Sequence, residues 1–488
     1  MSKEKLFAKL TKYKTEFIIF VALFLTYSYF FPQLPGWNVN SRLCLTYALV
    51  DEGRFEIDSC LNVPELETGD MAEYKGHFYS DKIIGTSLSG AVIYGILKLL
   101  MTVFGFSLSY AVKRYLITVF SVCVLSALAG VAMYRVLLLF KAKKREAILL
   151  TLAFSIGTLL FPYSTLFISY GPGILFSLLA YRLLLKHRIS GAMDNAPMFV
   201  IGLFVGLMLF FEYTFGIAVL GLTVYVFYFL KRKVRIFVFL VGVMIPLLIF
   251  AAYLLICFDS LSLPYALEKE DFFREGMAKG FMGITKLRPA VSYYITIHPY
   301  RGIFVFSPIL LVFFIGLVRI WRERRYHADF WLSAFIVIGQ VLFNSSYFVW
   351  WGGWSSGARH LIPMLGFMFP IILYGMKMAR GVKWVTYILG IISVGWMLII
   401  TSTDPQPQQI YDTTALLSPE ASYNYMSPMV RINFQSFIHG GLEKTLNLGR
   451  WIGLKKLWSL LPLIGIWMAS VSLFVKLRRK RKRLESLD

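Results

Sequence analysis

Apolar runs separated by short basic segments make up most of the chain. About 20 apolar residues cross the ~30 Å hydrocarbon core of a bilayer, and most of these runs approach that length. The pattern therefore predicts an all-α polytopic membrane protein, a single domain over residues 1–488 with about twelve transmembrane helices. The expected crossings cover residues 17–31, 115–140, 147–161, 165–185, 197–211, 215–230, 236–257, 302–318, 328–345, 361–374, 384–401 and 458–475.

Composition agrees with a membrane protein and excludes an ordinary soluble domain. The chain is 57% hydrophobic and 16% charged, with mean hydropathy +0.65. Soluble domains average about 45–50% apolar and about 25% charged residues. The net charge of +23 would indicate nucleic-acid binding in a soluble protein. Here the basic residues flank apolar runs, which predicts a cell (cytoplasmic) membrane location, both termini cytoplasmic and no nucleic-acid partner.

The run at residues 83–104 is ambiguous. If it crossed the membrane, the basic cluster KAKKR at 141–145 would lie outside, against the positive-inside rule. Three glycines at a spacing of five residues and Lys98 also disfavour an ordinary spanning helix. We therefore expect a juxtamembrane helix on the outer side.

This topology places an acidic, polar loop outside the membrane at residues 32–104. Between residues 38 and 85 it holds nine Asp or Glu against four Lys or Arg. A short helix is expected at residues 41–51, capped by Asn40 or Ser41 and stopped by Gly53. Further outer loops are expected at residues 258–301, 346–360 and 402–455. A polar loop held against a membrane scaffold is where we expect the chemistry.

Four aspartates of the first loop are candidate general bases: Asp51, Asp58, Asp70 and Asp81. A carboxylate at a membrane interface is partly desolvated, which tunes it for proton abstraction. Asp58 and Asp70 rank highest as catalytic residues because each lies in an irregular stretch. The alternative for each aspartate is a solvated loop acid without a catalytic role.

Basic residues near the outer surface are candidates for phosphate binding. Lys82 follows Asp81 at the start of the ambiguous run, where a long side chain reaches headgroup depth, and we assign both residues to substrate binding. Arg42 in the first loop and Arg301 at the start of a crossing are further candidates. Snorkelling without a ligand is the alternative for Lys82.

A second informative stretch is NSSYFVWWGGWSSGARHLIP at residues 344–363. Its tryptophans offer a stacking surface for a sugar, and its glycines allow close backbone approach. Arg359 and His360 then add positive charge and hydrogen-bonding capacity, so we assign Trp354, Arg359 and His360 to substrate binding. An ordinary aromatic belt explains the tryptophans but not the glycine-rich turn followed by Arg-His.

The four cysteines are too few for a disulfide framework. Cys123 and Cys257 lie inside apolar runs and are interpreted as packing residues. Cys44 and Cys60 share the first loop and could bridge in an oxidising compartment, although two free thiols are the favoured interpretation.

Several familiar motifs are absent from the sequence. There is no Walker A loop, no dinucleotide fingerprint, no HExxH or Cys/His cluster and no Gly-x-Ser-x-Gly elbow. We therefore predict no metal-ligating residues and no certain cofactor, with a divalent cation left open. A lipid-borne donor suits this architecture better than a soluble nucleotide.

The chain resembles the glycosyltransferase C superfamily of integral-membrane sugar transferases. It is similar to bacterial members that look like protein mannosyltransferases and the lipid A aminoarabinose transferase. The segment GHFYSDK at 76–82 is similar to that family's G-x-x-Y-x-x-K-P-P motif, although Ile83 and Ile84 replace the two prolines. RGIFVFSPILL at 301–311 and WWGGWSSGARHLIPML at 350–365 also look like segments of bacterial relatives.

The resemblance implies transfer of a hexose or pentose from a polyprenyl-phosphate carrier to a lipid, glycan or protein acceptor at the outer membrane face. A loop carboxylate would deprotonate the acceptor, and basic residues would hold the lipid phosphate. The family commonly has Asp-Glu just before the arginine of the first-loop helix, but residues 38–41 read Asn-Val-Asn-Ser before Arg42. The base is therefore expected at Asp58 or Asp70.

Two other functions stay open. A membrane transporter or lipid flippase would use ionisable residues at mid-membrane depth, for which Glu212 is the strong instance. Glu212 could equally pair with a nearby Arg or Lys. A non-catalytic membrane assembly factor is the third alternative.

Overall fold

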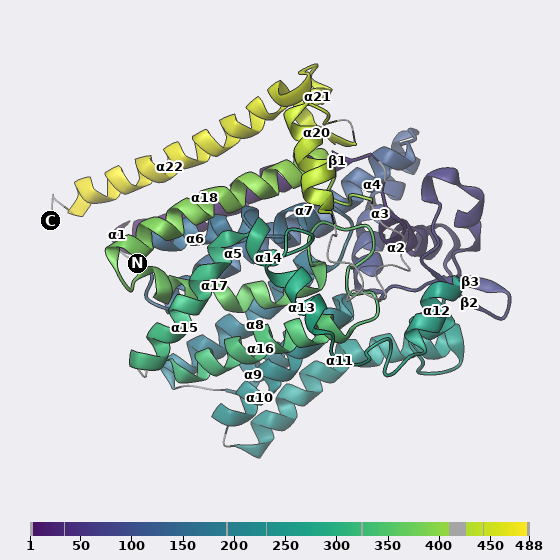
Figure 1. The fold of residues 1–488 in the computed structure, drawn as a ribbon, viewed down its shortest axis with the longest axis horizontal. Helices are drawn as coiled ribbons and strands as arrows, with labels where there is room; N and C mark the ends of the chain where they lie inside the picture. Colours follow the sequence, from purple (N-terminus) through teal and green to yellow (C-terminus); the bar gives the residue numbers. More distant parts are fainter. Residues whose placement is uncertain are drawn as a thin grey trace.

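The chain folds into a helical bundle, seen in a computed structural model (Figure 1). The structure describes residues 3–33, 35–191, 194–230, 232–323, 326–408, 426–442 and 444–485. Part of the outer loop predicted at 402–455 therefore lies outside the described residues, at 409–425 and 443.

The α-helices are α1 Lys3–Tyr27, α2 Trp37–Tyr47, α3 Gly85–Phe104, α4 Tyr110–Thr118, α5 Val124–Leu139, α6 Lys144–Ile156, α7 Leu160–Ser164, α8 Tyr170–Ser190, α9 Asn195–Phe211, α10 Gly216–Phe229, α11 Lys233–Phe258, α12 Asp271–Met277, α13 Pro289–Thr296, α14 Ile303–Phe306, α15 Val312–Glu323, α16 His327–Ser346, α17 Leu365–Met376, α18 Arg380–Thr403, α20 Gln435–Ile438, α21 Leu448–Trp451 and α22 Leu461–Glu485. Short 3₁₀ or π turns are η1 Ala48–Glu52, η2 Asp58–Asn62, η3 Pro64–Leu66, η4 Val119–Cys123, η5 Tyr213–Phe215, η6 Pro264–Leu267, η7 Pro308–Leu311, η8 Arg359–Met364, η10 Met429–Phe434 and η11 Lys456–Leu460. The strands are β1 Phe30–Pro32, β2 Met71–Tyr74, β3 His77–Ser80 and β4 Thr445–Asn447.

Seven helical stretches of the described residues are long and apolar enough to cross a membrane. They are Gly85–Phe104, Tyr110–Leu139, Lys233–Phe258, His327–Ser346, Arg359–Met376, Arg380–Thr403 and Lys456–Leu477. The predicted all-α, multi-pass membrane fold is thereby confirmed, whereas the count of about twelve crossings stays a prediction. The first of the seven is α3, so length and composition alone do not exclude a crossing there. Its expected position beside the membrane also stays a prediction.

The segment around Glu212 folds as two short helices, as predicted. α9 ends at Phe211 and α10 begins at Gly216, with Glu212 in an extended conformation between them. At this turn α3 begins against α9. A Cβ added to Gly85 would lie 2.3 Å from the Phe210 carbonyl oxygen, so only glycine allows this approach. The first loop is thus held directly on the membrane helices.

The predicted helix at 41–51 begins earlier than expected. α2 starts at Trp37, and Gly53, with φ +68°, ends the π turn that follows α2. Asn40 and Ser41 are therefore not caps but buried residues within α2. The reason is tertiary: both side chains bond to the later part of the loop rather than to the helix's own backbone.

The segments before and after the bundle meet in a short antiparallel pair. Phe30 pairs with Asn447 and Pro32 with Thr445, just beyond the end of α1. The Tyr29 hydroxyl donates to the Ser459 carbonyl at 2.6 Å, and α22 packs on α1. This pairing fixes the start of the first loop.

The first loop covers one end of the bundle. In Figure 1, α2, α3, β2 and β3 lie at the end opposite the start of α1 and the end of α22. The β2–β3 hairpin pairs Met71 with Ser80 and Tyr74 with His77. The base of this hairpin carries Asp70, Asp81 and Lys82.

Candidate active site

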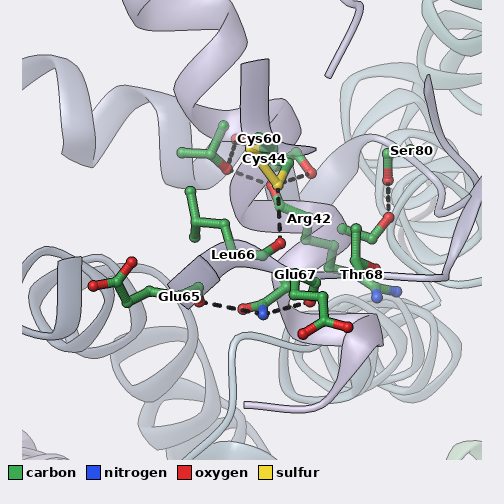
Figure 2. The surroundings of a disulfide bond; sticks show 12 residues. Arg42, Cys44, Cys60, Glu65, Leu66, Glu67, Thr68 and Ser80 are labelled. Atoms are coloured by element: carbon green, nitrogen blue, oxygen red, sulfur yellow. Dashed lines mark hydrogen bonds between the residues drawn. A yellow bond between two sulfur atoms is a disulfide. The ribbon is translucent and has the colours of Figure 1, made fainter. Parts of the chain in front are cut away.

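A disulfide joins Cys44 on α2 to Cys60 on η2 (Figure 2). The two Cα atoms are 5.8 Å apart, and both residues are buried. The favoured interpretation of two free thiols is therefore wrong. Sequence spacing could not decide it, because the pairing depends on η2 folding back against α2.

Polar residues of α2 tie the loop together around this disulfide. The Asn40 amide donates to the Glu67 carbonyl at 2.9 Å, and the Ser41 hydroxyl bonds to the Ser80 hydroxyl at 2.8 Å. Ser41 also donates to Asp81 Oδ1 at 3.1 Å. The hairpin base is thereby anchored on α2.

Lys82 is the centre of a buried ionic group at that base. Its Nζ lies 2.8 Å from Asp70 Oδ2, contacts Asp81 Oδ2 and lies 5.4 Å from the centre of the Tyr265 ring. The Asp81 side chain is 0% exposed, the Lys82 side chain 8% and the Asp70 side chain 18%. Lys82 is thus enclosed rather than snorkelling into open solvent, and Asp70 is the accessible carboxylate of the group.

Glu268 completes the group, which we call the Lys82 cluster (Asp70, Asp81, Lys82 and Glu268). Burial, followed by the Asp81 carboxylate, raises the pKa of Glu268 to about 11, while the Lys82 ammonium acts in the opposite direction. Glu268 is therefore protonated at neutral pH. Sequence analysis missed it because it opens the charged run Glu-Lys-Glu-Asp at 268–271, which looks like a solvated segment.

Asp58 lies at the tip of the hairpin, away from its base. Its two oxygens bind His77 Nδ1 and the Phe78 backbone N–H, each at 2.7 Å. No hydrogen bond or ion pair within the described residues joins Asp58 to Lys82. Its predicted catalytic role stays a prediction, but its visible contacts hold the hairpin together.

Asp51, the other loop candidate, pairs with Lys98 at 2.8 Å and accepts from the Tyr94 hydroxyl at 2.9 Å. Both partners belong to α3. These contacts attach the end of the π turn to α3.

Arg42, predicted to bind phosphate, is buried against the membrane helices. Its guanidinium lies 3.6 Å from Glu212 and donates to the Ser169 hydroxyl at 3.0 Å, and that hydroxyl donates to Glu212 at 2.9 Å. The Arg42 guanidinium also donates to the Asn38 carbonyl at 3.0 Å. Glu212 is therefore a paired carboxylate, the alternative considered for it. The phosphate role of Arg42 stays a prediction.

Arg301 organises the glycine-rich turn that follows Trp350 and Trp351. It is fully buried and donates to the Ser355 hydroxyl at 2.7 Å and to the carbonyls of Ser355, Gly357 and Gly353. A guanidinium with so many carbonyl partners shapes a backbone loop. Its predicted contact with a phosphate stays untested; both terminal nitrogens are engaged, whereas its buried Nε has no partner among the described residues.

The tryptophans of this turn divide into buried and exposed residues. Trp350 and Trp351 are 0% and 1% exposed, whereas Trp354 is 54% exposed. Trp354 is thus the ring of the three that is free to stack on a sugar, although its role stays a prediction. His360 is buried, with its ring 5.4 Å from the Tyr347 ring.

Arg359 differs from these cations because its buried Nε has no hydrogen-bond partner and no ion pair of Arg359 occurs among the described residues. Its stem crosses the turn so closely that a Cβ added to Gly352 would lie 2.9 Å from Arg359 Nε. The Glu212 and Asp70 carboxylates act electrostatically on the guanidinium. The Arg359 side chain thus packs against Gly352, is half-buried and has no ionic partner within the described part of the chain.

Tyr347 connects Arg359 with the Lys82 cluster. Burial raises the pKa of the Tyr347 phenol, the Lys82 and Arg359 cations oppose this, and the Glu268 and Glu212 carboxylates add to it. The charges of Lys82 in the first loop, of Arg359 and of the two glutamates thus all act on the Tyr347 phenol. Tyr347 therefore lies within electrostatic range of both the first loop and Arg359.

The described part of the chain holds no group of three or more His, Cys, Asp or Glu side chains arranged to hold a metal ion. The basic Lys82 ammonium occupies the centre of the acidic residues at the hairpin base. A divalent cation as cofactor stays untested.

No protein-family model matches the chain, and no curated protein sequence matches it. Among solved structures the chain is similar to the crystal structure of ArnT from Cupriavidus metallidurans in the apo state. The TM-score is 0.48 and the sequence identity 11%, over 98% of this chain and 73% of that chain.

Proposed function

We propose that the protein transfers a sugar from a polyprenyl-phosphate carrier to a lipid, glycan or protein acceptor at the outer face of the cell membrane. The observation that carries the proposal is the guanidinium of Arg359, which has no ionic partner among the described residues and lies within electrostatic range of Asp70 in the Lys82 cluster. The Arg359 side chain is half-buried, and its buried Nε lacks a hydrogen-bond partner among the described residues, so an anion that reaches the guanidinium gains a partly desolvated cation. The same place supplies a carboxylate, Asp70, for proton abstraction.

Arg359 and Lys82 are proposed to hold the lipid phosphate. An arriving phosphate competes with Asp70 for the Lys82 ammonium, which lies 2.8 Å from that carboxylate in the free protein. Negative charge on the phosphate grows as its bond to the sugar breaks. Fixed cations therefore stabilise the transition state more than the bound donor.

Asp70 is proposed as the general base. The acceptor hydroxyl gives its proton to Asp70 while its oxygen bonds to the anomeric carbon, and the carbon–oxygen bond to the phosphate breaks. The products are the glycosylated acceptor and polyprenyl phosphate. Asp81 is fully enclosed, so we propose that it positions Lys82. Asp58 is less suited because both of its oxygens have partners in the hairpin.

The pairing of Glu212 weakens the transporter alternative. A transporter would use a carboxylate that changes partners at membrane depth. Glu212 instead has Arg42 and Ser169 as fixed partners. The enzyme proposal uses the unpaired charge of Arg359, which a static assembly factor would not need.

The test is sugar transfer by the purified protein in lipid nanodiscs, from polyprenyl phosphate carrying labelled glucose, mannose or arabinose to extracted cell-envelope acceptors. Arg359→Gln should slow transfer about 10²–10³-fold, the effect of removing one electrostatic donor. The control is Arg319→Gln, because Arg319 pairs with Glu323 on α15. Sugar-lipid translocation in proteoliposomes without covalent transfer would overturn the proposal.

A further inference from the structure

Several buried polar atoms near Arg359 have no hydrogen-bond partner among the described residues. They belong to three elements: η5, α16 and η8. The atoms are Thr214 Oγ1, Gln340 Oε1, both amide atoms of Asn344 and one ring nitrogen of His360, whose ring otherwise faces the Val349 backbone. Asn344 and Gln340 are 0% exposed, so bulk water does not reach these groups. Unsatisfied buried groups are rare in folded proteins and call for a water or ligand partner.

The three elements are tied together at one point. The Gln340 amide nitrogen donates to the Thr214 carbonyl at 3.0 Å and to the His360 carbonyl at 2.6 Å. Asn344 follows Gln340 by one helical turn, so both side chains lie on the same face of α16. The unsatisfied atoms are therefore neighbours and not scattered through the core. We call Thr214, Gln340, Asn344 and His360 the amide–imidazole group.

This group adjoins the proposed phosphate site. His360 follows Arg359 directly, and its ring contacts the Tyr347 ring at 5.4 Å. The Lys82 and Arg359 charges both act electrostatically on the Tyr347 phenol. In a sugar phosphate, one oxygen atom joins the phosphorus to the anomeric carbon. A phosphate held by Arg359 therefore places the sugar ring within reach of this group.

The chemistry of the group fits hydroxyls better than other ligands. Amides, an imidazole and a hydroxyl offer both donors and acceptors and carry no fixed charge. A sugar hydroxyl likewise both donates and accepts. A phosphate would require cations, and an isoprenoid chain would require an apolar surface.

We infer that the amide–imidazole group binds the ring hydroxyls of the transferred sugar and so selects the donor. This inference rests on the proposed function and adds specificity-determining residues to it. Asn344 is the central residue, because both its donor and its acceptor are buried and unsatisfied. The group is separate from the cations proposed to hold the phosphate.

The experiment measures the dissociation constants of two probes with the protein in nanodiscs: polyprenyl phosphate, and polyprenyl phosphate carrying glucose, mannose or arabinose. Asn344→Leu should weaken binding of the best sugar-bearing probe about tenfold, the value of a net hydrogen bond or two. Binding of sugar-free polyprenyl phosphate should stay unchanged. Ser333→Ala is the matched control, since Ser333 lies on the same helix but bonds to the Phe367 carbonyl.

A second measurement needs no variant. Donors that lack one ring hydroxyl are compared with the parent donor on the wild-type protein, and at least one should bind about tenfold more weakly. Equal affinity for all deoxy donors and the parent would overturn the inference, with ordered water as the partner of the group. An unchanged ratio between the two probes in Asn344→Leu would also overturn it. Absence of binding by either probe would instead remove the proposed function.

Discussion

The Lys82 ammonium lies 2.8 Å from the Asp70 carboxylate, and this contact closes the base of the β2–β3 hairpin. Asp70 directly precedes β2 and Lys82 follows β3 by two residues. Pairing of Met71 with Ser80 brings the two side chains to the same place. The hairpin therefore sets the geometry between the proposed base and one of the proposed phosphate cations.

Asp70→Asn should slow sugar transfer about 10²–10⁴-fold, the usual contribution of a general base. The asparagine keeps the size of the side chain but cannot take up the acceptor proton. Asp58→Asn is the matched comparison and should leave the rate within a fewfold, because Asp58 supports the hairpin tip. Transfer rates from a labelled donor check both variants. An equal loss in Asp58→Asn would contradict the assignment of the base to Asp70.

Gly352→Ala should weaken binding of polyprenyl phosphate about tenfold or more. The new Cβ would lie 2.9 Å from Arg359 Nε, which forces the guanidinium to move. Gly353→Ala is a close control because Gly353 also has positive φ, +67° against +76°, but open space at the Cβ position. Both variants should lose about 1–2 kcal/mol of stability from backbone strain.

The measurement is lipid-binding affinity in nanodiscs together with the thermal unfolding midpoint. Similar midpoints with different affinities would support the positioning of Arg359 by the turn. Equal affinities in the two glycine variants would show that the close contact with Gly352 does not matter for binding.

Glu268→Gln should flatten the pH dependence of stability. The pKa of Glu268 is about 11 in the folded chain, against an ordinary value of 4.5. Between these values the folded state holds a proton that the unfolded state has lost, so stability falls as pH rises. Unfolding midpoints in detergent at pH 6 and pH 9, followed by tryptophan fluorescence, check this. A slope in Glu268→Gln as steep as in the wild type would assign the effect to other groups.

The Cys44→Ala/Cys60→Ala double variant should unfold at a lower temperature and transfer sugar more slowly. The two cysteines are 16 residues apart, and a disulfide closing a loop of that size contributes about 3 kcal/mol in the chain-entropy model. Cys123→Ala is the control, since Cys123 is a free, buried cysteine. Mass spectrometry of alkylated peptides tests the bond itself. Alkylation of both thiols without reduction would contradict the disulfide.

The helices could be predicted from the sequence because apolar runs and local breakers are sufficient to locate them. The turn at Glu212 between α9 and α10 and the stop at Gly53 follow from local residues alone. The start of α2 could not be predicted, since Asn40 and Ser41 look like caps but bond to residues 27 and 40 positions later. Local preference was overridden by tertiary contacts.

The sequence predicts only some of the residues of the candidate site. Residue type and position identify Lys82, Asp70 and Arg359 as candidates; in the structure Lys82 contacts Asp70, and Asp70 acts electrostatically on Arg359. Glu268 was missed because its burial depends on contact with a hairpin about 200 residues earlier. The hydrogen-bond partners of Arg301 lie in a turn about 50 residues later, so the sequence alone could not predict that Arg301 shapes this turn.

The antiparallel pair of β1 with β4 has a consequence for how the protein is made. Tyr29 and Ser459, which bond beside this pair, are separated by 430 residues. At a synthesis rate of about 5–20 residues per second, roughly 20 to 90 s separate the synthesis of Tyr29 from the synthesis of Ser459. The β1–β4 pair at the start of the first loop therefore forms only after synthesis has reached the residues before α22. Nascent chains arrested before that point should leave this loop open to proteases.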